Sequence, residues 1–288
     1  MDWQIFFLIN LLTASVREYL NKRIADSIDP LVGFFQMMAF SSGWLYFIYG
    51  INFQSFPEID LKVGLTGIFF IAGFIAYLKS VKYSLSQSIL FQSYSILVTL
   101  ILTALFLGEK KYFDISTTVG KKIVAGGVLA VLAIWFLLHF DKKREEKLEL
   151  RWLFYIVTSI FFFGIGSFSS IYFIRQSSII WVLIQQLTVM VPILWLLNIF
   201  SNKKVILPKK LMMLTFLSSV FSTIAALSFF QALTIVPVAK FLPLQQVSLV
   251  IITMFTGILF FKEARFFSSK RLLGMGLGLF GIILLVTA

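Results

Sequence analysis

Several glutamines lie inside long apolar stretches of this 288-residue chain, where their amides are well suited to bind a solute. An amide carries two donors and two acceptor lone pairs, so it can replace water around an uncharged or zwitterionic molecule. The same amides can instead tie helices together, at about 0.6 kcal/mol each on average in a membrane. Both roles are open for the polar side chains of these stretches: Gln92, Gln246, Gln245, Gln87, Gln186, Tyr94 and Asn10.

Two charged residues in the apolar stretches have chemistry that transport could use. Lys240 precedes Gln246 by about a turn and a half of helix and could neutralise an anionic or carboxylate-bearing solute. Glu18 is the acidic candidate for proton coupling, although Lys22, four residues on, can pair with it instead. The aromatic residues are mainly lipid-facing bulk and interface anchors, and Trp181 is one of those that could reach a cavity.

We find no enzymatic motif in this sequence. The lone His139 lies beside charged residues at the end of an apolar stretch, and cysteine is absent, so disulfides are excluded. No zinc-protease or Walker motif occurs, and we expect no catalytic residues, no metal site and no cofactor. The glycines of 276–281 fit a dinucleotide pattern, but no strand precedes them; a small-residue packing face, with Gly274 and Gly278 as its clearest pair, explains them better.

The elements that must position these residues are membrane helices. The chain is 59% hydrophobic and only 13% charged, whereas an ordinary soluble domain is about a quarter charged. A helix needs about 20 apolar residues to cross a bilayer. This pattern predicts an all-α polytopic membrane protein of about ten transmembrane helices, at 3–24, 30–51, 61–82, 85–107, 117–139, 152–174, 178–200, 210–233, 237–261 and 270–287. The net charge of +12 then reflects loops and helix ends, and we expect a lipid bilayer and no nucleic acid as partner.

The chain repeats itself with an offset of 154 residues, which carries Glu109 onto Glu263 and Gln92 onto Gln246. The repeats are predicted at residues 1–140 and 152–288, with 141–151 as a charged linker. Five helices per repeat is an odd number, so the second repeat enters the membrane from the opposite side and the repeats are inverted. Equivalent positions in such repeats converge near the pseudo-two-fold axis, which favours Gln92 and Gln246 as solute contacts.

An apolar helix that ends in Leu107-Gly108-Glu109, followed by a basic loop and a Gly-rich helix, resembles the drug/metabolite transporter superfamily, EamA type. The resemblance implies a ten-helix secondary carrier of amino acids, sugars, nucleotide sugars, amines or lipid-linked sugars. We therefore expect alternating access for a small polar metabolite, by a monomer or homodimer in a bacterial-type plasma membrane. One alternative is a flippase for a lipid-linked sugar, with Lys79, Lys82 and Lys240 as its basic residues. Another is a non-transporting membrane scaffold or receptor.

Two expectations conflict on the side of the membrane at which the termini lie. Of the 25 lysines and arginines, about 18 fall opposite the termini and about 7 on the termini's side. Because basic residues favour the cytoplasmic side, this count predicts both termini outside. The family resemblance implies termini that face the cytoplasm.

Overall fold

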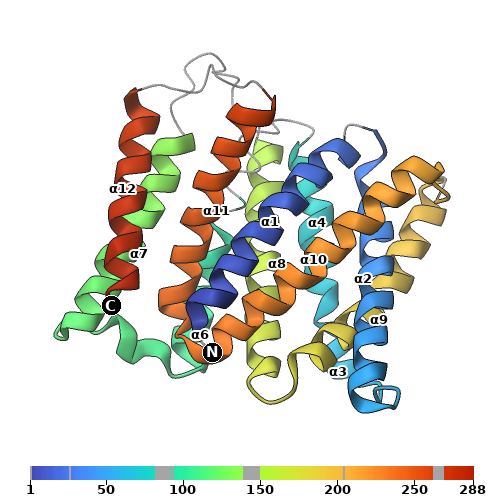
Figure 1. Ribbon diagram of the computed structural model, residues 1–288, viewed down its shortest axis with the longest axis horizontal. Helices are drawn as coiled ribbons and strands as arrows, with labels where there is room; N and C mark the ends of the chain where they lie inside the picture. Colours follow the sequence, from blue (N-terminus) through green and yellow to red (C-terminus); the bar gives the residue numbers. More distant parts are fainter. Residues whose placement is uncertain are drawn as a thin grey trace. The chain divides into compact units, whose positions relative to one another are not determined.

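The helices predicted from the sequence are present in the computed structural model. It describes residues 2–25, 27–81, 92, 94–138, 150–203, 205–261 and 269–288 (Figure 1). Their elements are α1 (Trp3–Ala25), α2 (Pro30–Phe53), α3 (Leu61–Leu65), α4 (Gly67–Val81), α6 (Ser95–Phe106), the 3-10 helix η1 (Glu109–Phe113), α7 (Thr118–Leu138), α8 (Leu150–Ile174), α9 (Ile179–Phe200), α10 (Lys209–Ile235), α11 (Val238–Phe261) and α12 (Ser269–Val286). Every predicted segment contains a helix, and the described ends agree within about two residues, apart from the start of the fourth, which lies outside the described residues.

Length and composition identify the membrane-crossing helices. Five described segments are long and apolar enough to cross a bilayer: Pro30–Phe53, Leu61–Ser80, Arg151–Ile174, Ile179–Phe200 and Lys209–Ile235. Two shorter apolar helices are Ser95–Phe106 and Gly276–Val286. The protein is therefore an all-α, multi-pass membrane protein, as the sequence predicts.

Polar residues at the loop ends start several helices. Asp29 accepts a hydrogen bond from the backbone N–H of Leu31, and Pro30 occupies the first turn of α2, where its missing N–H costs nothing. Asp29 also pairs with Lys203 of the α9–α10 loop. Burial raises the pKa of Asp29, but the bonds from Lys203 and Leu31 outweigh it and leave this pKa below its ordinary value. The pair thus fixes two loops to each other.

The third predicted helix, 61–82, is present as a span from Leu61 to Ser80, in which Thr66 separates α3 from α4 while its own backbone stays right-handed helical. The hydroxyl of Thr66 donates to the carbonyl of Val63 at 2.6 Å. On either side, Gly64 and Gly67 lie against the backbone of α9: a Cβ at these positions would be 2.9 Å and 2.8 Å from the carbonyl oxygens of Gln185 and Gln186. Only glycine permits this approach, and the sequence pattern of an apolar run does not report it.

The chain forms two compact units, each of which combines segments from both halves of the sequence. Unit 1 comprises Met1–Ile71 and Ser169–Thr234, and unit 2 comprises Ala72–Phe168 and Ile235–Ala288. The boundaries fall inside α4 and α8, so these two helices contribute to both units. The units are thus not the predicted sequence repeats, whose bounds at 1–140 and 152–288 describe duplication and stay a prediction.

Side chains tie α1 and α9 to their neighbours within unit 1. The Asn10 amide donates to the carbonyl of Ala225 on α10 at 2.8 Å, which joins α1 to α10. Tyr46 on α2 shares a 2.7 Å hydrogen bond with Thr188 on α9. Such bonds replace the hydrophobic drive between helices, which lipid tails largely remove.

Close backbone approach organises unit 2. The helices α7 and α12 lie side by side (green and red in Figure 1). A Cβ on Gly126 of α7 would be 3.1 Å from the carbonyl oxygen of Gly281 on α12, and a Cβ on Gly281 would be 3.2 Å from that of Gly126. Beside this contact, Ala130 and Ala133 of α7 form an apolar cluster with Val247 and Ile251 of α11. Small residues thus let three helices pack tightly.

Candidate functional site

A buried glutamine of α9 shapes the loop before α3 in unit 1. Gln185 is only 1% exposed. Its Nε2 donates to the carbonyl of Glu58 at 2.7 Å, and its Oε1 accepts from the backbone N–H of Asp60 at 2.8 Å. The amide therefore pairs with the backbone on both sides of Ile59, as a neighbouring strand would. This brace fixes the path of residues 58–60 over the start of α9.

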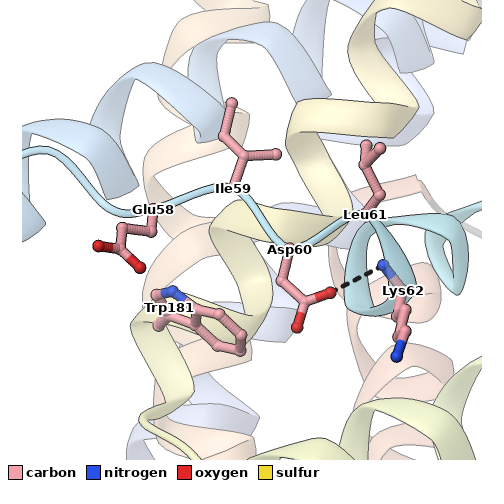
Figure 2. Close-up of a pocket in the computed structure, with 6 residues that line it drawn as sticks. All are labelled: Glu58, Ile59, Asp60, Leu61, Lys62 and Trp181. Carbon is pink, nitrogen blue, oxygen red and sulfur yellow. Dashed lines mark hydrogen bonds between the residues drawn. The ribbon is translucent and has the colours of Figure 1, made fainter.

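The braced loop forms one wall of a pocket of about 490 Å³. Its lining consists of Glu58, Ile59, Asp60, Leu61, Lys62 and Trp181. Figure 2 shows Glu58 and Asp60 directed toward the side where Trp181 lies, whereas Ile59 and Leu61 point away. Among the residues proposed from sequence, Trp181 alone reaches this pocket; the two carboxylates were missed because they lie in a loop outside the apolar stretches.

The neighbouring Gln186 is used in helix ties. It is buried, and its Nε2 donates to Thr66 Oγ1 at 2.8 Å and to Ser170 Oγ at 2.9 Å. These bonds join α9 to the break between α3 and α4 and to the end of α8. The bonding capacity of this amide is largely consumed, so its prediction as a solute contact gains no support from the geometry.

Three further predicted residues belong to unit 1 or lie outside the described part. Asn10 is buried and bonded to α10, as given above. The backbone of Glu18 is helical within α1, but its side chain lies outside the described residues, as does Gln87 altogether. The roles of Glu18 in coupling and of Gln87 in binding stay predictions.

Gln92, in unit 2, is anchored through one half of its amide. Its Oε1 accepts a short hydrogen bond from Ser159 Oγ of α8, and that hydroxyl also lies 2.9 Å from the carbonyl of Gly73. Gln92 is half-buried, and within the described part of the chain its Nε2 makes no bond. The amide is therefore oriented by protein while its donors stay available.

Tyr94 brings the region of Gln92 close to α11. Its ring packs against the cluster that contains Val247, the residue after Gln246. Gln246 is half-buried and, among the described residues, makes no hydrogen bond through its amide. Gln245, beside it, is buried. The two repeat-equivalent segments thus meet within unit 2. Of the two amides, that of Gln246 makes fewer hydrogen bonds with the described residues than that of Gln92.

Lys240, near the start of α11, contacts the C-terminal end of α12. Its Nζ donates to the carbonyl of Val286 at 3.3 Å, and Lys122 Nζ donates to the carbonyl of Thr287 at 2.9 Å. Both ammonium groups therefore cap the C-terminus of α12, where orphan carbonyls and the helix dipole favour cations. A structural role accounts for Lys240 in this arrangement, and its predicted contact with an anionic solute stays a prediction.

Gly108 and Glu109 of the Leu107-Gly108-Glu109 motif each have a structural role in unit 2. Gly108 has φ of 69°, the left-handed conformation that ends helices, so the chain turns directly after α6. This turn buries Glu109, which is 2% exposed. Its carboxylate oxygens accept from the backbone N–H groups of Val238 at 3.2 Å and Ala239 at 3.0 Å, the first residues of α11. Sequence reasoning used the motif as a repeat marker and for the family resemblance, and it missed this cap.

Comparison with known proteins identifies the second half of the chain. Residues 150–287 match the EamA-like transporter family. No curated protein sequence matches the chain. Among solved structures, 25 chains match. One, a crystal structure with 14% sequence identity, covers 98% of this chain and 95% of its own with a TM-score of 0.72, which shows a shared fold.

Proposed function

We propose that this chain, which carries an EamA-like transporter domain at residues 150–287, is a secondary carrier of a small polar metabolite. The match at residues 150–287 and the apolar helices support a multi-pass membrane transporter of the drug/metabolite transporter type, a kind that is generally not enzymatic. The proposal adds an uncharged or zwitterionic solute and alternating access between inverted repeats. It also includes a bacterial-type plasma membrane as the location and a monomer or homodimer as the active form.

The amide of Gln246, which makes no hydrogen bond with the described residues, carries the proposal. Gln246 lies eight residues into α11, about 12 Å along the helix from its start. Within a membrane, an unbonded amide is costly unless water or a solute satisfies it. Its repeat equivalent, Gln92, has one side of its amide held by Ser159 and its donors available. One amide held by Ser159 and a second without a described partner, in neighbouring segments, suit the hydroxyl, amide or carboxylate groups of a small metabolite.

The experiment begins with a thermal-shift screen of the purified protein against pools of metabolites. A ligand present at 100 times its Kd adds about 2.7 kcal/mol to the free energy of unfolding. Uptake of a stabilising compound is then measured in proteoliposomes. We expect Gln246→Leu and Gln92→Leu each to abolish transport, since leucine keeps the volume and removes the hydrogen bonds.

Gln231→Leu is the matched control. Gln231 lies on α10, one turn before the helix ends, and is half-buried like Gln246. The same substitution there should leave transport intact. Unchanged elution and unfolding midpoints of all three variants would show that they fold. Transport that survives in both Gln92→Leu and Gln246→Leu would refute the proposed site.

The two alternative functions gain less from the structure. A flippase needs basic groups for a lipid headgroup, but Lys79 Nζ lies 5.3 Å from the ring centroid of Tyr155, and Lys240 caps α12. Lys82, the third basic residue of this alternative, lies outside the described residues. A scaffold would gain nothing from an amide such as that of Gln246, which has no hydrogen-bond partner among the described residues. The same transport assay separates all three functions, because a scaffold moves no solute and a flippase moves only the lipid-linked sugar.

A further inference from the structure

We propose that the pocket beside Trp181 in unit 1 binds the ammonium group of a small organic cation. The proposal does not depend on the transport site in unit 2. It uses three observations: a loop held in an extended shape, two carboxylates on one side of that loop, and an indole ring that faces the same pocket. Each is taken in turn below.

The loop is built to present its acidic side chains together. In an extended segment, side chains two residues apart point to the same side. The Gln185 amide, bonded to the carbonyl of Glu58 and the N–H of Asp60, holds residues 58–60 in that shape. Figure 2 shows the result, with Glu58 and Asp60 toward Trp181 and Ile59 on the other side. A buried amide thus orients two surface carboxylates.

Both carboxylates keep oxygen atoms that can accept a hydrogen bond from a bound cation or pair with its charge. Asp60 Oδ1 caps α3 by accepting from the N–H groups of Lys62 at 2.8 Å and Val63 at 3.4 Å, which leaves Oδ2. Glu58, within the described part of the chain, has neither a hydrogen bond nor an ion pair through its carboxylate. Lys62 lines the pocket but forms no ion pair with either described carboxylate. Two carboxylates and one ammonium give the lining a net negative charge.

The ring of Trp181 selects the kind of cation. Ser178 caps α9 and accepts from the backbone N–H of Trp181 at 3.3 Å, so the residue is fixed in the first turn. An indole face attracts ammonium groups, most strongly where water is partly excluded, and Trp181 is half-buried. A metal ion is a poorer fit: calcium takes six to eight oxygen ligands, and the described residues hold no cluster of three or more metal-binding side chains.

Titration calorimetry of the full-length protein in detergent tests the proposal with two probes of nearly equal shape. Choline carries a trimethylammonium group, and 3,3-dimethylbutan-1-ol is its uncharged carbon isostere. We expect choline to bind and the isostere to bind at least about tenfold more weakly. Glu58→Gln, Asp60→Asn and Trp181→Leu should each raise the Kd for choline about fivefold or more, whereas Lys62→Gln should lower it.

The variants are chosen to keep the loop folded. Asparagine caps a helix about as well as aspartate, so Asp60→Asn preserves the start of α3 while it removes the charge. Asp114→Asn is the matched control, because Asp114 also caps a turn in a loop but lies outside the pocket, and choline affinity should not change. Gln246→Leu should likewise leave the Kd for choline unchanged, so failure of the transport proposal and failure of this one are distinguishable.

Several outcomes would overturn the proposal. Equal affinity for choline and its isostere would show an apolar pocket. Undiminished choline binding in the variant that combines Glu58→Gln with Asp60→Asn would place any cation site elsewhere. Loss of binding that appears in Asp114→Asn as strongly as in Glu58→Gln would reduce the effect to net charge.

Discussion

At the scale of single residues, Glu109 shows how one side chain can join two distant parts of the sequence. Its carboxylate serves the first N–H groups of α11, 129 and 130 residues away in the chain. Those N–H groups have no partner within their own helix, and the helix dipole adds a further attraction for negative charge. A buried carboxylate is costly unless it is bonded in this way. Glu109 therefore fixes the start of α11, the helix that carries Gln246.

We predict that Glu109→Ala lowers the free energy of unfolding by about 1–3 kcal/mol, because two buried N–H groups lose their acceptor. Glu109→Gln should lie between the alanine variant and the native protein, since one amide oxygen still accepts. Unfolding of the detergent-solubilised protein, followed by circular dichroism, measures both. Asp114→Asn serves as control, because Asp114 is exposed and should show no loss. Equal stability of Glu109→Ala and the native protein would contradict the cap.

At the scale of elements, contact between α7 and α12 depends on which glycine faces the partner helix. The sequence pattern favoured Gly274 and Gly278 as a packing pair. Gly278 does pack closely, because a Cβ there would be 3.2 Å from Ile251 Cδ1 of α11, and the backbone-to-backbone approach lies at Gly281 and Gly126. Gly164 of α8 also packs closely: a Cβ there would be 2.4 Å from Val98 Cβ of α6. Spacing identifies a small-residue face, but only the packed helices show which residue touches.

Adjacent glycines of α7 give a controlled test of this packing. A Cβ at Gly126 would lie 2.7 Å from Leu285 Cγ and 3.1 Å from the Gly281 carbonyl oxygen, whereas a Cβ at Gly127 would meet nothing within 4 Å. Gly126→Ala should therefore destabilise the protein by about 1–3 kcal/mol through overpacking. Gly127→Ala should be neutral or stabilise it by up to about 1 kcal/mol, since alanine favours helix. Unfolding midpoints compare the pair, and equal effects would exclude close contact as the cause.

At the scale of the whole molecule, orientation in the membrane is the feature on which two arguments disagree. The excess of basic residues opposite the termini includes five from the charged linker at 141–151, which also carries acidic residues. Removing those five leaves about 13 against 7, which preserves the sign of the bias. The structure adds that Lys122 and Lys240, on the termini's side, cap α12. Their placement has a local structural reason in addition to any role in orientation.

We predict from the charge bias that both termini lie outside. The chain lacks cysteine, so single cysteines introduced by Asp2→Cys and Glu145→Cys report the topology without background. An impermeant maleimide applied to intact cells should label residue 2 and spare residue 145. Labelling of 145 but not of 2 would show that the family orientation holds and the charge argument fails. Labelling of both sites after permeabilisation is the control for accessibility.

The sequence by itself determined the features that depend on local chemistry. The length of apolar runs placed the helices, and residues such as Asp29 and Pro30 marked a helix start, because a helix satisfies its backbone within one segment and its ends need nearby caps. The apolar runs and the residues of the Leu-Gly-Glu motif pointed to the family, which the match at residues 150–287 supports.

Only the tertiary structure decided the partner of each polar side chain. Gln185 meets the backbone of Asp60 across 125 residues of sequence, and Gln186 meets Thr66 across 120, whereas the amide of Gln246 meets no described partner. All three are glutamines in apolar stretches and look alike in the sequence. Their roles differ because a hydrogen bond needs a partner within about 3 Å, and packing between distant segments supplies it. The same packing set Glu58 and Asp60 beside Trp181.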